Sequence, residues 1–247
     1  MKPERDTATF FDGRSKDYYS ANYEAPRTRH AHNLALRRAA CLELFPDVAG
    51  KVLDVGCGPG AMAIPLLERG HEVVAIDISA GMVRDAARRA RDLGYTASVA
   101  VADATSLPFA DGSFGVVVTT GVLEYIQDVR GAMREIARVL RPGGVVIATM
   151  SLPRRLERFT VRMYLRVSGR PGGAAQYIHD RKSFDAIVES AGLAIDGRRC
   201  CSFAPFPVDA LWPPAVSWID RHFSDALNHV DRACDHAKTY IVRAVKP

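Results

Sequence analysis

Short apolar strands alternate with helical segments over residues 51–150. Five runs rich in Val and Ile are predicted strands, and they span 51–55, 72–77, 97–102, 115–120 and 144–150. Helices are predicted between them at 61–69, 80–93 and 129–140, and Ser79 is the expected N-cap of the second. Nearly continuous apolar runs are typical of parallel strands that are buried on both faces. This order of elements predicts a doubly wound α/β sheet with helices on both faces.

The rest of the chain divides into an N-terminal part, two insertions and two last strands. We expect an N-terminal helical lid over 1–48, with a helix over 29–45 ended by Pro46, and then a core over 49–150. Segments 151–192 and 202–237 are predicted cap insertions, and 183–191 within the first is a predicted helix. Strands at 193–201 and 238–245 would complete the sheet. The prediction is one domain with an inserted helical cap.

The composition excludes several classes of protein. With 48% apolar residues, 25% charged residues and a net charge of +5, the chain is an ordinary globular sequence in which nucleic acid is not the expected partner. No apolar run is long enough to span a membrane, and the charged N-terminus is unlike a signal peptide. Five cysteines without CxxC spacing predict reduced thiols, with Cys200 and Cys201 as packing residues, no metal site and a cytoplasmic location.

The most informative motif is the glycine loop after the first predicted strand. Asp54 lies near the end of that strand, and the loop has glycines at positions 56, 58 and 60. Such a loop lets a ligand approach the backbone and the positive end of the next helix. With Asp77 on the following strand, the pattern also fits a loose dinucleotide motif, so an NAD oxidoreductase is one interpretation. An acid at Asp54 favours instead a ligand with an ammonium group, a carboxylate and a ribose, such as S-adenosylmethionine.

Several motifs of this chain resemble those of the class I S-adenosylmethionine-dependent methyltransferases, and they occur in the same order as in that family. Asp-Val-Gly-Cys-Gly-Pro-Gly from Asp54 resembles motif I of the family, and Val-Val-Ala-Ile-Asp ending at Asp77 resembles its second-strand motif. Further matches are the segments 102–114, 121–125 and 138–144. The resemblance implies a Rossmann-like, mostly parallel seven-stranded sheet. It also implies a small-molecule methyltransferase of the ubiquinone/menaquinone-methyltransferase-like branch.

The resemblance implies a role for each residue of these motifs. The glycines would hold the methionine part of the cofactor, Asp54 its ammonium group and Asp77 both ribose hydroxyls. Asp103 would accept a hydrogen bond from adenine, although an Asx turn is the alternative reading of this residue. The predicted cofactor-binding residues are Tyr18, Asp54, Gly56, Cys57, Gly58, Gly60, Asp77, Ile78, Met82, Asp103, Ala104 and Thr120.

Three residues are the main candidates for catalysis. His30 is near the start of the predicted N-terminal helix, Glu124 follows the fourth strand, and His179 lies in the first insertion, just before its predicted helix. A base helps an O-methyltransferase by deprotonating a hydroxyl, whereas an N-methyltransferase needs only a neutral amine. Each histidine could instead be solvated or cap a helix, and Glu124 could be a structural hydrogen-bond partner. The family usually has His where this chain has Tyr125, and no catalytic role is carried over to that position.

The two predicted insertions are the segments that we expect to bind the acceptor. Arginines recur every four residues from Arg154 to Arg170, on one broad face of an amphipathic helix. This stripe is a solvated face, a clamp for an anionic acceptor, or a contact with lipid or RNA. Trp212 and Trp218 make the second insertion aromatic, which suggests an apolar acceptor pocket, a lid or a homodimer contact.

The predicted function is a cytoplasmic S-adenosylmethionine-dependent methyltransferase. It would methylate an O or N atom of a small-molecule acceptor, anionic or aromatic, by direct in-line displacement. A tRNA methyltransferase and a non-catalytic cofactor-binding subunit are the alternatives. An NAD oxidoreductase is disfavoured, because a nicotinamide cofactor explains neither Asp54 nor Asp103.

Overall fold

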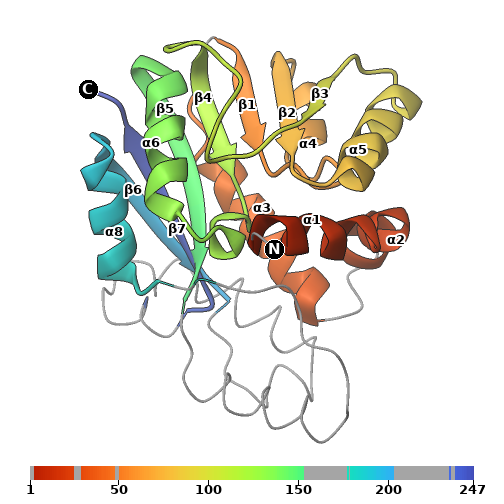
Figure 1. The fold of residues 1–247 in the computed structure, drawn as a ribbon, viewed down its shortest axis with the longest axis horizontal. Coiled ribbons are helices and arrows are strands. Elements are labelled where there is room, and N and C mark those ends of the chain that lie inside the picture. Colours follow the sequence, from red (N-terminus) through yellow and green to blue (C-terminus); the bar gives the residue numbers. More distant parts are fainter. Residues whose placement is uncertain are drawn as a thin grey trace, which may run out of the picture.

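A computed structural model describes residues 3–24, 29–47, 50–152, 177, 179–202, 234 and 237–247. Its centre is a seven-stranded sheet in the order β3-β2-β1-β4-β5-β7-β6 (Figure 1). The strands are β1 (Val52–Val55), β2 (Val73–Asp77), β3 (Ser98–Val101), β4 (Phe114–Thr119), β5 (Leu140–Ser151), β6 (Ala194–Cys201) and β7 (Thr239–Val245). β7 runs antiparallel to both of its neighbours, whereas the pairs from β3 to β5 are parallel. The predicted Rossmann-like, mostly parallel sheet is confirmed, with β7 as its antiparallel strand.

Burial along the strands follows their positions in the sheet. β1 and β4, in the centre, are buried at every residue, whereas the edge strand β3 is largely exposed. β5 begins before the predicted start because Leu140 already pairs with Phe114 of β4, and the residues after it bond to the end of the chain. The N–H of Gly143 donates to the carbonyl of Lys246 (2.8 Å), and the N–H of Lys246 donates to the carbonyl of Gly144 (2.9 Å).

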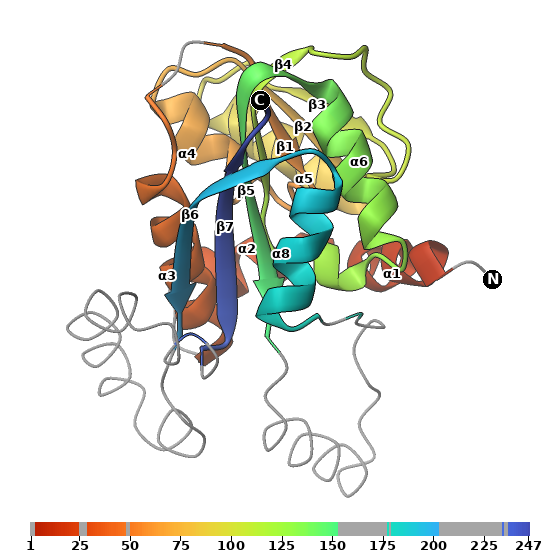
Figure 2. The same ribbon diagram turned by 90° about the vertical axis from the view of Figure 1, so that its left-hand side faces the viewer.

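Helices cover both faces of the sheet (Figure 2). Those on one face are α3 (Arg29–Glu43), α4 (Ala63–Glu68) and α5 (Ala80–Asp92), and those on the other are α6 (Val129–Val139) and α8 (Arg181–Ser190). Buried side chains such as Leu66 and Ala86 pack on the first face, and Met133 and Ile187 pack on the second. Ser79 caps α5 as predicted, because its Oγ accepts from the N–H of Met82.

The N-terminal part contains short helices that precede α3. They are α1 (Pro3–Asp12), α2 (Ser15–Tyr19) and a π-helical turn at Ser20–Glu24. In Figure 1, α1 and α2 lie across the carboxyl ends of the parallel strands. The helical content expected of residues 1–48 is therefore present in its described part, and its role as a lid stays a prediction.

Most of the two insertions lies outside the described residues. The arginine stripe from Arg154 to Arg170, together with Trp212 and Trp218, falls in this part of the chain. The predicted helix over 183–191 is found as α8, which begins after its N-cap Asp180. Among the described residues, no helix is long and apolar enough to cross a membrane.

The predicted state of the cysteines is wrong for one pair. Cys200, in β6, forms a disulfide with Cys234, and the two Cα atoms are 5.6 Å apart. Cys41, Cys57 and Cys201 are buried and form no disulfide with the other cysteines, all of which the structure describes. The spacing of the cysteines could not reveal this bond, because the fold brings the end of β6 beside the segment that precedes β7. Because a disulfide is present, the cysteines no longer favour a cytoplasmic location.

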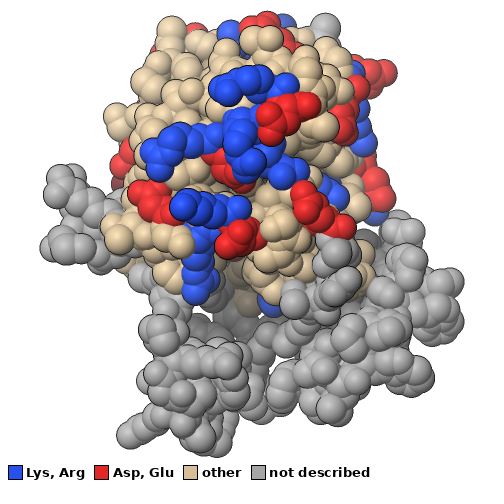
Figure 3. Space-filling view, turned by 90° about the vertical axis from the view of Figure 1, so that its right-hand side faces the viewer, with Lys and Arg blue, Asp and Glu red and all other residues tan. Residues whose placement is uncertain are grey.

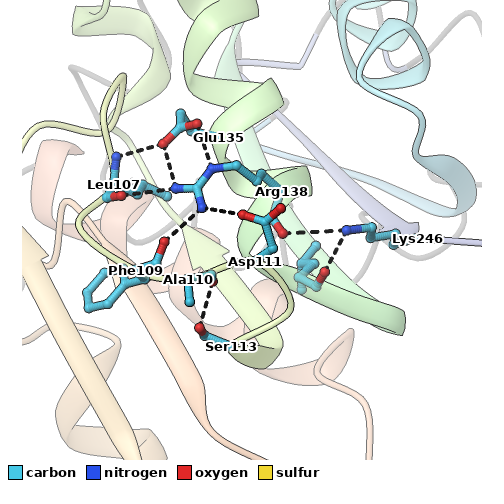
Figure 4. Close-up of polar contacts among 9 residues, drawn as sticks. Leu107, Phe109, Ala110, Asp111, Ser113, Glu135, Arg138 and Lys246 are labelled. Atoms are coloured by element: carbon cyan, nitrogen blue, oxygen red, sulfur yellow. Dashed lines mark hydrogen bonds and ion pairs between the residues drawn. The ribbon is translucent and has the colours of Figure 1, made fainter.

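Arg138 fixes the loop between β3 and β4 (Figure 4). Its Nη1 donates to the carbonyl of Phe109 and to Oδ1 of Asp111 (2.7 Å each), and its Nη2 donates to the carbonyl of Leu107 (3.0 Å). Glu135, one turn earlier on α6, accepts from Nε and Nη2 of Arg138 (2.9 Å each) and from the N–H of Leu107 (2.8 Å). Two of the motifs seen in the sequence, 102–114 and 138–144, therefore meet in space.

Arg138→Ala is expected to lower the free energy of unfolding by about 2–3 kcal/mol, because loop carbonyls and Glu135 lose a charged donor. Urea unfolding followed by circular dichroism measures the change. Arg130→Ala is the matched control on α6, since its exposed guanidinium donates to Oγ of Ser190 (3.2 Å). We expect this control to change stability by less than about 0.5 kcal/mol. Equal losses in the two variants would contradict the role given to Arg138.

Candidate cofactor and acceptor site

A cavity of about 490 Å³ lies at the carboxyl ends of the parallel strands. Its walls come from the glycine loop, the ends of β2 and β4, the loop after β3, and the helices α1, α2 and α3. Doubly wound sheets bind ligands at this edge. The predicted residues that line it are Tyr18, His30, Gly56, Cys57, Gly58, Asp77, Ile78, Met82, Asp103, Ala104, Thr120 and Glu124. Asp54, Gly60 and His179 were also predicted, and they do not line this cavity.

The glycine loop has a backbone that other residues adopt only with strain. Gly56, Gly58 and Gly60 have φ angles of +71°, +53° and +90°. A Cβ at Gly56 would overlap Val122, with Cγ1 at 2.8 Å, whereas a Cβ at Gly58 would meet nothing within 4 Å. The N–H of Gly56 donates to the carbonyl of Ile76 (2.8 Å), which ties the loop to β2. The loop is therefore closely packed at Gly56 and open at Gly58.

Asp77 ends β2 with both carboxylate oxygens held in place. Oδ2 accepts from the N–H of Gly58 and Oδ1 accepts from the N–H of Ser79, both at 2.9 Å. Burial raises the pKa of Asp77, and the two amide donors oppose this change. Each carboxylate oxygen can accept more than one hydrogen bond, and the predicted contact of Asp77 with the ribose hydroxyls stays a prediction.

Asp54 lies beneath the glycine loop rather than in the cavity. Its side chain is 1% exposed, and it accepts a hydrogen bond from the backbone of Ala63. Among the described residues, Oδ2 of Asp54 has no hydrogen-bond partner. Burial raises the pKa of Asp54 to about 7, and the charge of Asp77 adds to this. The predicted contact of Asp54 with an ammonium group stays a prediction.

Asp54→Asn is expected to change how stability depends on pH. The carboxyl has a pKa of about 7 in the folded protein, against an ordinary value of 3.8, so between these values the folded state holds a proton that the unfolded chain has lost. The stabilisation that comes from this proton is fully present below pH 3.8. As pH rises from 3.8 to about 7, the unfolding free energy falls by up to about 1.4 kcal/mol per pH unit, and the stabilisation is lost.

Urea unfolding of both proteins across this pH window checks the prediction. The difference in unfolding free energy between Asp54→Asn and the wild type should shift in favour of the variant as pH rises. A difference that stays constant with pH would contradict the raised pKa. Comparing the two proteins at each pH cancels the contributions of their other titrating groups.

The predicted adenine side is built from the segments after β2 and β3. Ile78 and Met82 line the cavity from the first segment, and Asp103 and Ala104 line it from the second. Oδ1 of Asp103 accepts from both the N–H and the Oγ of Thr105 (2.8 Å each). These two bonds form an Asx turn, which was the alternative interpretation of Asp103 in the sequence. They fix its carboxylate at the cavity wall.

Glu124 is a buried acid on the cavity wall, in the 3₁₀-helix Leu123–Tyr125. It is 3% exposed, and its Oε1 accepts from Oγ of Ser151 (2.9 Å). This contact confirms a structural bond for one oxygen. The other oxygen, Oε2, has no hydrogen-bond partner among the described residues. It is the atom through which Glu124 could act on a ligand.

Of the two candidate histidines, only His30 lines the cavity. It lies in the first turn of α3, and burial lowers its pKa to about 4, with the charges of Lys238 and Arg37 adding to the effect. Its imidazole is therefore neutral at pH 7 and can accept a proton or a hydrogen bond. His179 instead precedes Asp180, the N-cap of α8, and its predicted role in catalysis stays a prediction.

Arg37, Tyr23 and Lys238 also line the cavity, and none of them was predicted. Arg37 lies about two turns after His30 on α3, so helical periodicity could have found it. Burial alone would lower the pKa of Arg37, but Tyr23 and Glu124 act in the opposite direction and the pKa is raised. Arg37 is thus a fixed positive charge in the wall, hydrogen-bonded to Tyr23.

Aromatic side chains form one wall of the cavity. The ring of Phe11, from α1, packs edge-on against Tyr125 with a centroid distance of 5.3 Å, and it lies 6.3 Å from the ring of Tyr18. Tyr19 does not line the cavity, and its ring packs against the guanidinium of Arg89 (3.2 Å). Of the adjacent tyrosines, only Tyr18 therefore belongs to the site.

The chain is similar to known methyltransferases in sequence. Residues 53–148 match a family described as a methyltransferase domain. The demethylmenaquinone methyltransferase of Beutenbergia cavernae is 40% identical over 118 residues, which cover 47% of this chain and 48% of that protein. The demethylmenaquinone methyltransferase of Mycolicibacterium paratuberculosis is 33% identical over 204 residues, which cover 78% of this chain and 84% of that protein. The chain belongs to the class I S-adenosylmethionine-dependent methyltransferases.

Solved structures of class I methyltransferases share the fold. Magnesium protoporphyrin IX methyltransferase from Synechocystis, solved with bound SAH, superposes with a TM-score of 0.71 over 100% of both chains at 16% identity. The predicted family and its cofactor, S-adenosylmethionine, are confirmed. The chain spans about half the length of the first curated relatives that it matches.

Proposed function

We propose that this methyltransferase moves the methyl group of S-adenosylmethionine to an oxygen or nitrogen atom of a small-molecule acceptor. One observation carries the proposal. The carboxylate of Asp77 is held by two amides at 2.9 Å each, at the wall of a cavity that also reaches Glu124 and His30. The acid that we propose to bind the ribose and the two candidate proton acceptors thus line one cavity.

The residues of the chain fit the parts of this cofactor. When bound, S-adenosylmethionine supplies an electrophilic methyl group on a sulfonium. Asp77 would bind the ribose hydroxyls, Asp103 would bind the adenine, and Arg37 would pair with the carboxylate. Phe11 and Tyr125 would exclude water from the reacting atoms. Alignment of two ligands in such a site can supply roughly 7–11 kcal/mol of the barrier reduction.

The acceptor half of the cavity favours a flat acceptor with an acidic oxygen. Rings of Phe11, Tyr18 and Tyr125 offer faces and edges for stacking, and Lys238 adds positive charge. The curated relatives carry the name demethylmenaquinone methyltransferase, which supports a quinone-type ring. Either Glu124 or the neutral His30 would accept the proton of an acceptor hydroxyl.

Methyl transfer to a panel of quinols, phenols and aromatic amines tests the proposal. We expect a product heavier by one CH₂ group together with S-adenosylhomocysteine, detected by mass spectrometry. Fragmentation of the product locates the methylated atom, and a new bond to carbon would overturn the assignment to oxygen or nitrogen. Glu124→Gln and His30→Gln, compared in their pH–rate profiles, identify the base. Cofactor binding without turnover of any compound would favour a non-catalytic subunit instead.

A tRNA methyltransferase is the second candidate, and it needs a continuous basic surface. Figure 3 shows Lys and Arg intermixed with Asp and Glu on one face of the molecule. On α5, for example, Arg88 pairs with Asp85. Binding of tRNA at rising salt concentration separates the candidates, because phosphate contacts give a steep loss of affinity. We expect weak binding at every salt concentration.

A further inference from the structure

Asp12, the last residue of α1, is hydrogen-bonded to the N-terminal end of α5. Its Oδ1 accepts from Oγ of Ser79 (2.6 Å) and from the N–H of Gly81 (2.7 Å). A carboxylate is favoured at this place because the first N–H groups of a helix lack partners within the helix. The same two donors lower the pKa of Asp12, so it is ionised at neutral pH.

Ser79 connects Asp12 to the acid that faces the ribose position. The N–H of Ser79 donates to Oδ1 of Asp77 (2.9 Å), while its Oγ donates to Asp12 and accepts from the N–H of Met82 (3.1 Å). A hydrogen-bonded path therefore runs from α1 to the side chain of Asp77. Both Asp77 and Met82 line the cavity.

The two N-terminal helices approach α5 closely at Gly81. A Cβ at Gly81 would lie 2.7 Å from Oγ of Ser15 and 3.0 Å from Oδ1 of Asp12. This contact holds the segment that contributes Phe11 and Tyr18 to the cavity wall. Farther along α5, the guanidinium of Arg89 packs on the ring of Tyr19 and lies 3.6 Å from Glu24.

We propose that Asp12 is a positioning residue for the cofactor. By binding Ser79 and Gly81 it fixes the N-terminal helices over the cavity and orients the carboxylate of Asp77. Asp12 itself does not line the cavity, so its effect on the cofactor would pass through Ser79 and Asp77. This inference rests on the proposed function, since it assigns the cavity to S-adenosylmethionine.

The test is the rate at which S-adenosylhomocysteine leaves the folded protein, measured together with its dissociation constant. We expect Asp12→Ala to weaken binding by about tenfold, mainly through faster release, because the wall formed by α1 opens more often. Asp12→Asn keeps an acceptor oxygen and should recover most of the affinity. Asp17→Ala, an exposed acid on α2, is the matched control and should bind as the wild type does.

Gly81→Ala provides an independent variant if Asp12→Ala fails to fold. Alanine favours the helix α5 itself, yet its Cβ would push against Ser15 and Asp12, so cofactor release should again be faster. Hydrogen exchange of residues 7–19 should increase in both variants while exchange in β1 and β4 is unchanged. A general loss of structure would instead raise exchange throughout the sheet.

The outcomes separate this inference from the proposed function. Wild-type release rates in folded Asp12→Ala and Gly81→Ala would overturn the role of Asp12 and leave the methyltransferase assignment intact. Failure of the wild-type protein to bind S-adenosylhomocysteine would overturn both.

Discussion

Asp77→Ala is expected to weaken binding of S-adenosylhomocysteine by at least about 100-fold. The carboxylate would accept two hydrogen bonds from the ribose, and bonds to a charged acceptor contribute about 1.5–3 kcal/mol each. A 100-fold change corresponds to about 2.7 kcal/mol, so the loss of both bonds accounts for it. Isothermal titration calorimetry measures the affinity, and circular dichroism confirms that the variant is folded.

The effect on stability should be small, because two contributions oppose each other. Removal of a buried acid whose pKa is raised by burial is favourable, whereas the amides of Gly58 and Ser79 lose their acceptor. Asp92→Ala, at the exposed end of α5, is the control and should leave the affinity unchanged. Wild-type affinity in folded Asp77→Ala would remove the assigned ribose contact.

Gly56→Ala is expected to lose about 2–5 kcal/mol of unfolding free energy and to abolish measurable cofactor binding. The φ of +71° costs a residue with a side chain about 1–2 kcal/mol. The new methyl group would also overlap Val122, and such overpacking costs about 1–3 kcal/mol. Urea unfolding gives the stability, and calorimetry with S-adenosylhomocysteine gives the binding.

Two further variants separate the cost of backbone strain at positive φ from the cost of the overlap with Val122. Gly58→Ala has a φ of +53° but no atom within 4 Å of the new Cβ, so it should cost only the backbone contribution of about 1–2 kcal/mol. Adding Val122→Ala to Gly56→Ala should restore the part of the stability that is lost to overlap. Equal stability of the two glycine variants would show that the contact with Val122 does not matter.

The sequence predicts the core of the fold well because the strands are continuous apolar runs. β1, β2 and β4 lie within two residues of the predicted limits, and Ser79 caps α5 as expected. The start of β5 at Leu140 was not predicted, because it depends on pairing with Phe114 of β4, which lies far from it in the sequence. The bond between Cys200 and Cys234 was missed for a related reason, since the folded chain and not the spacing brings them together.

Residues of the site were found where a local motif marks them. Gly56, Asp77 and Asp103 follow or end strands, so their common position at one edge of the sheet could be anticipated. Arg37 lies in α3 and Lys238 lies just before β7, and neither residue belongs to a recognisable sequence motif. The path from Asp12 through Ser79 likewise exists only after α1 has docked on α5.

Calorimetric titration of the purified protein with S-adenosylmethionine and with S-adenosylhomocysteine tests the central claim most directly. We expect each compound to bind once per chain, and both to lose affinity together in Asp77→Ala. If correctly folded wild-type protein binds neither compound, the assignment of the cavity at the ends of β1, β2 and β4 is contradicted.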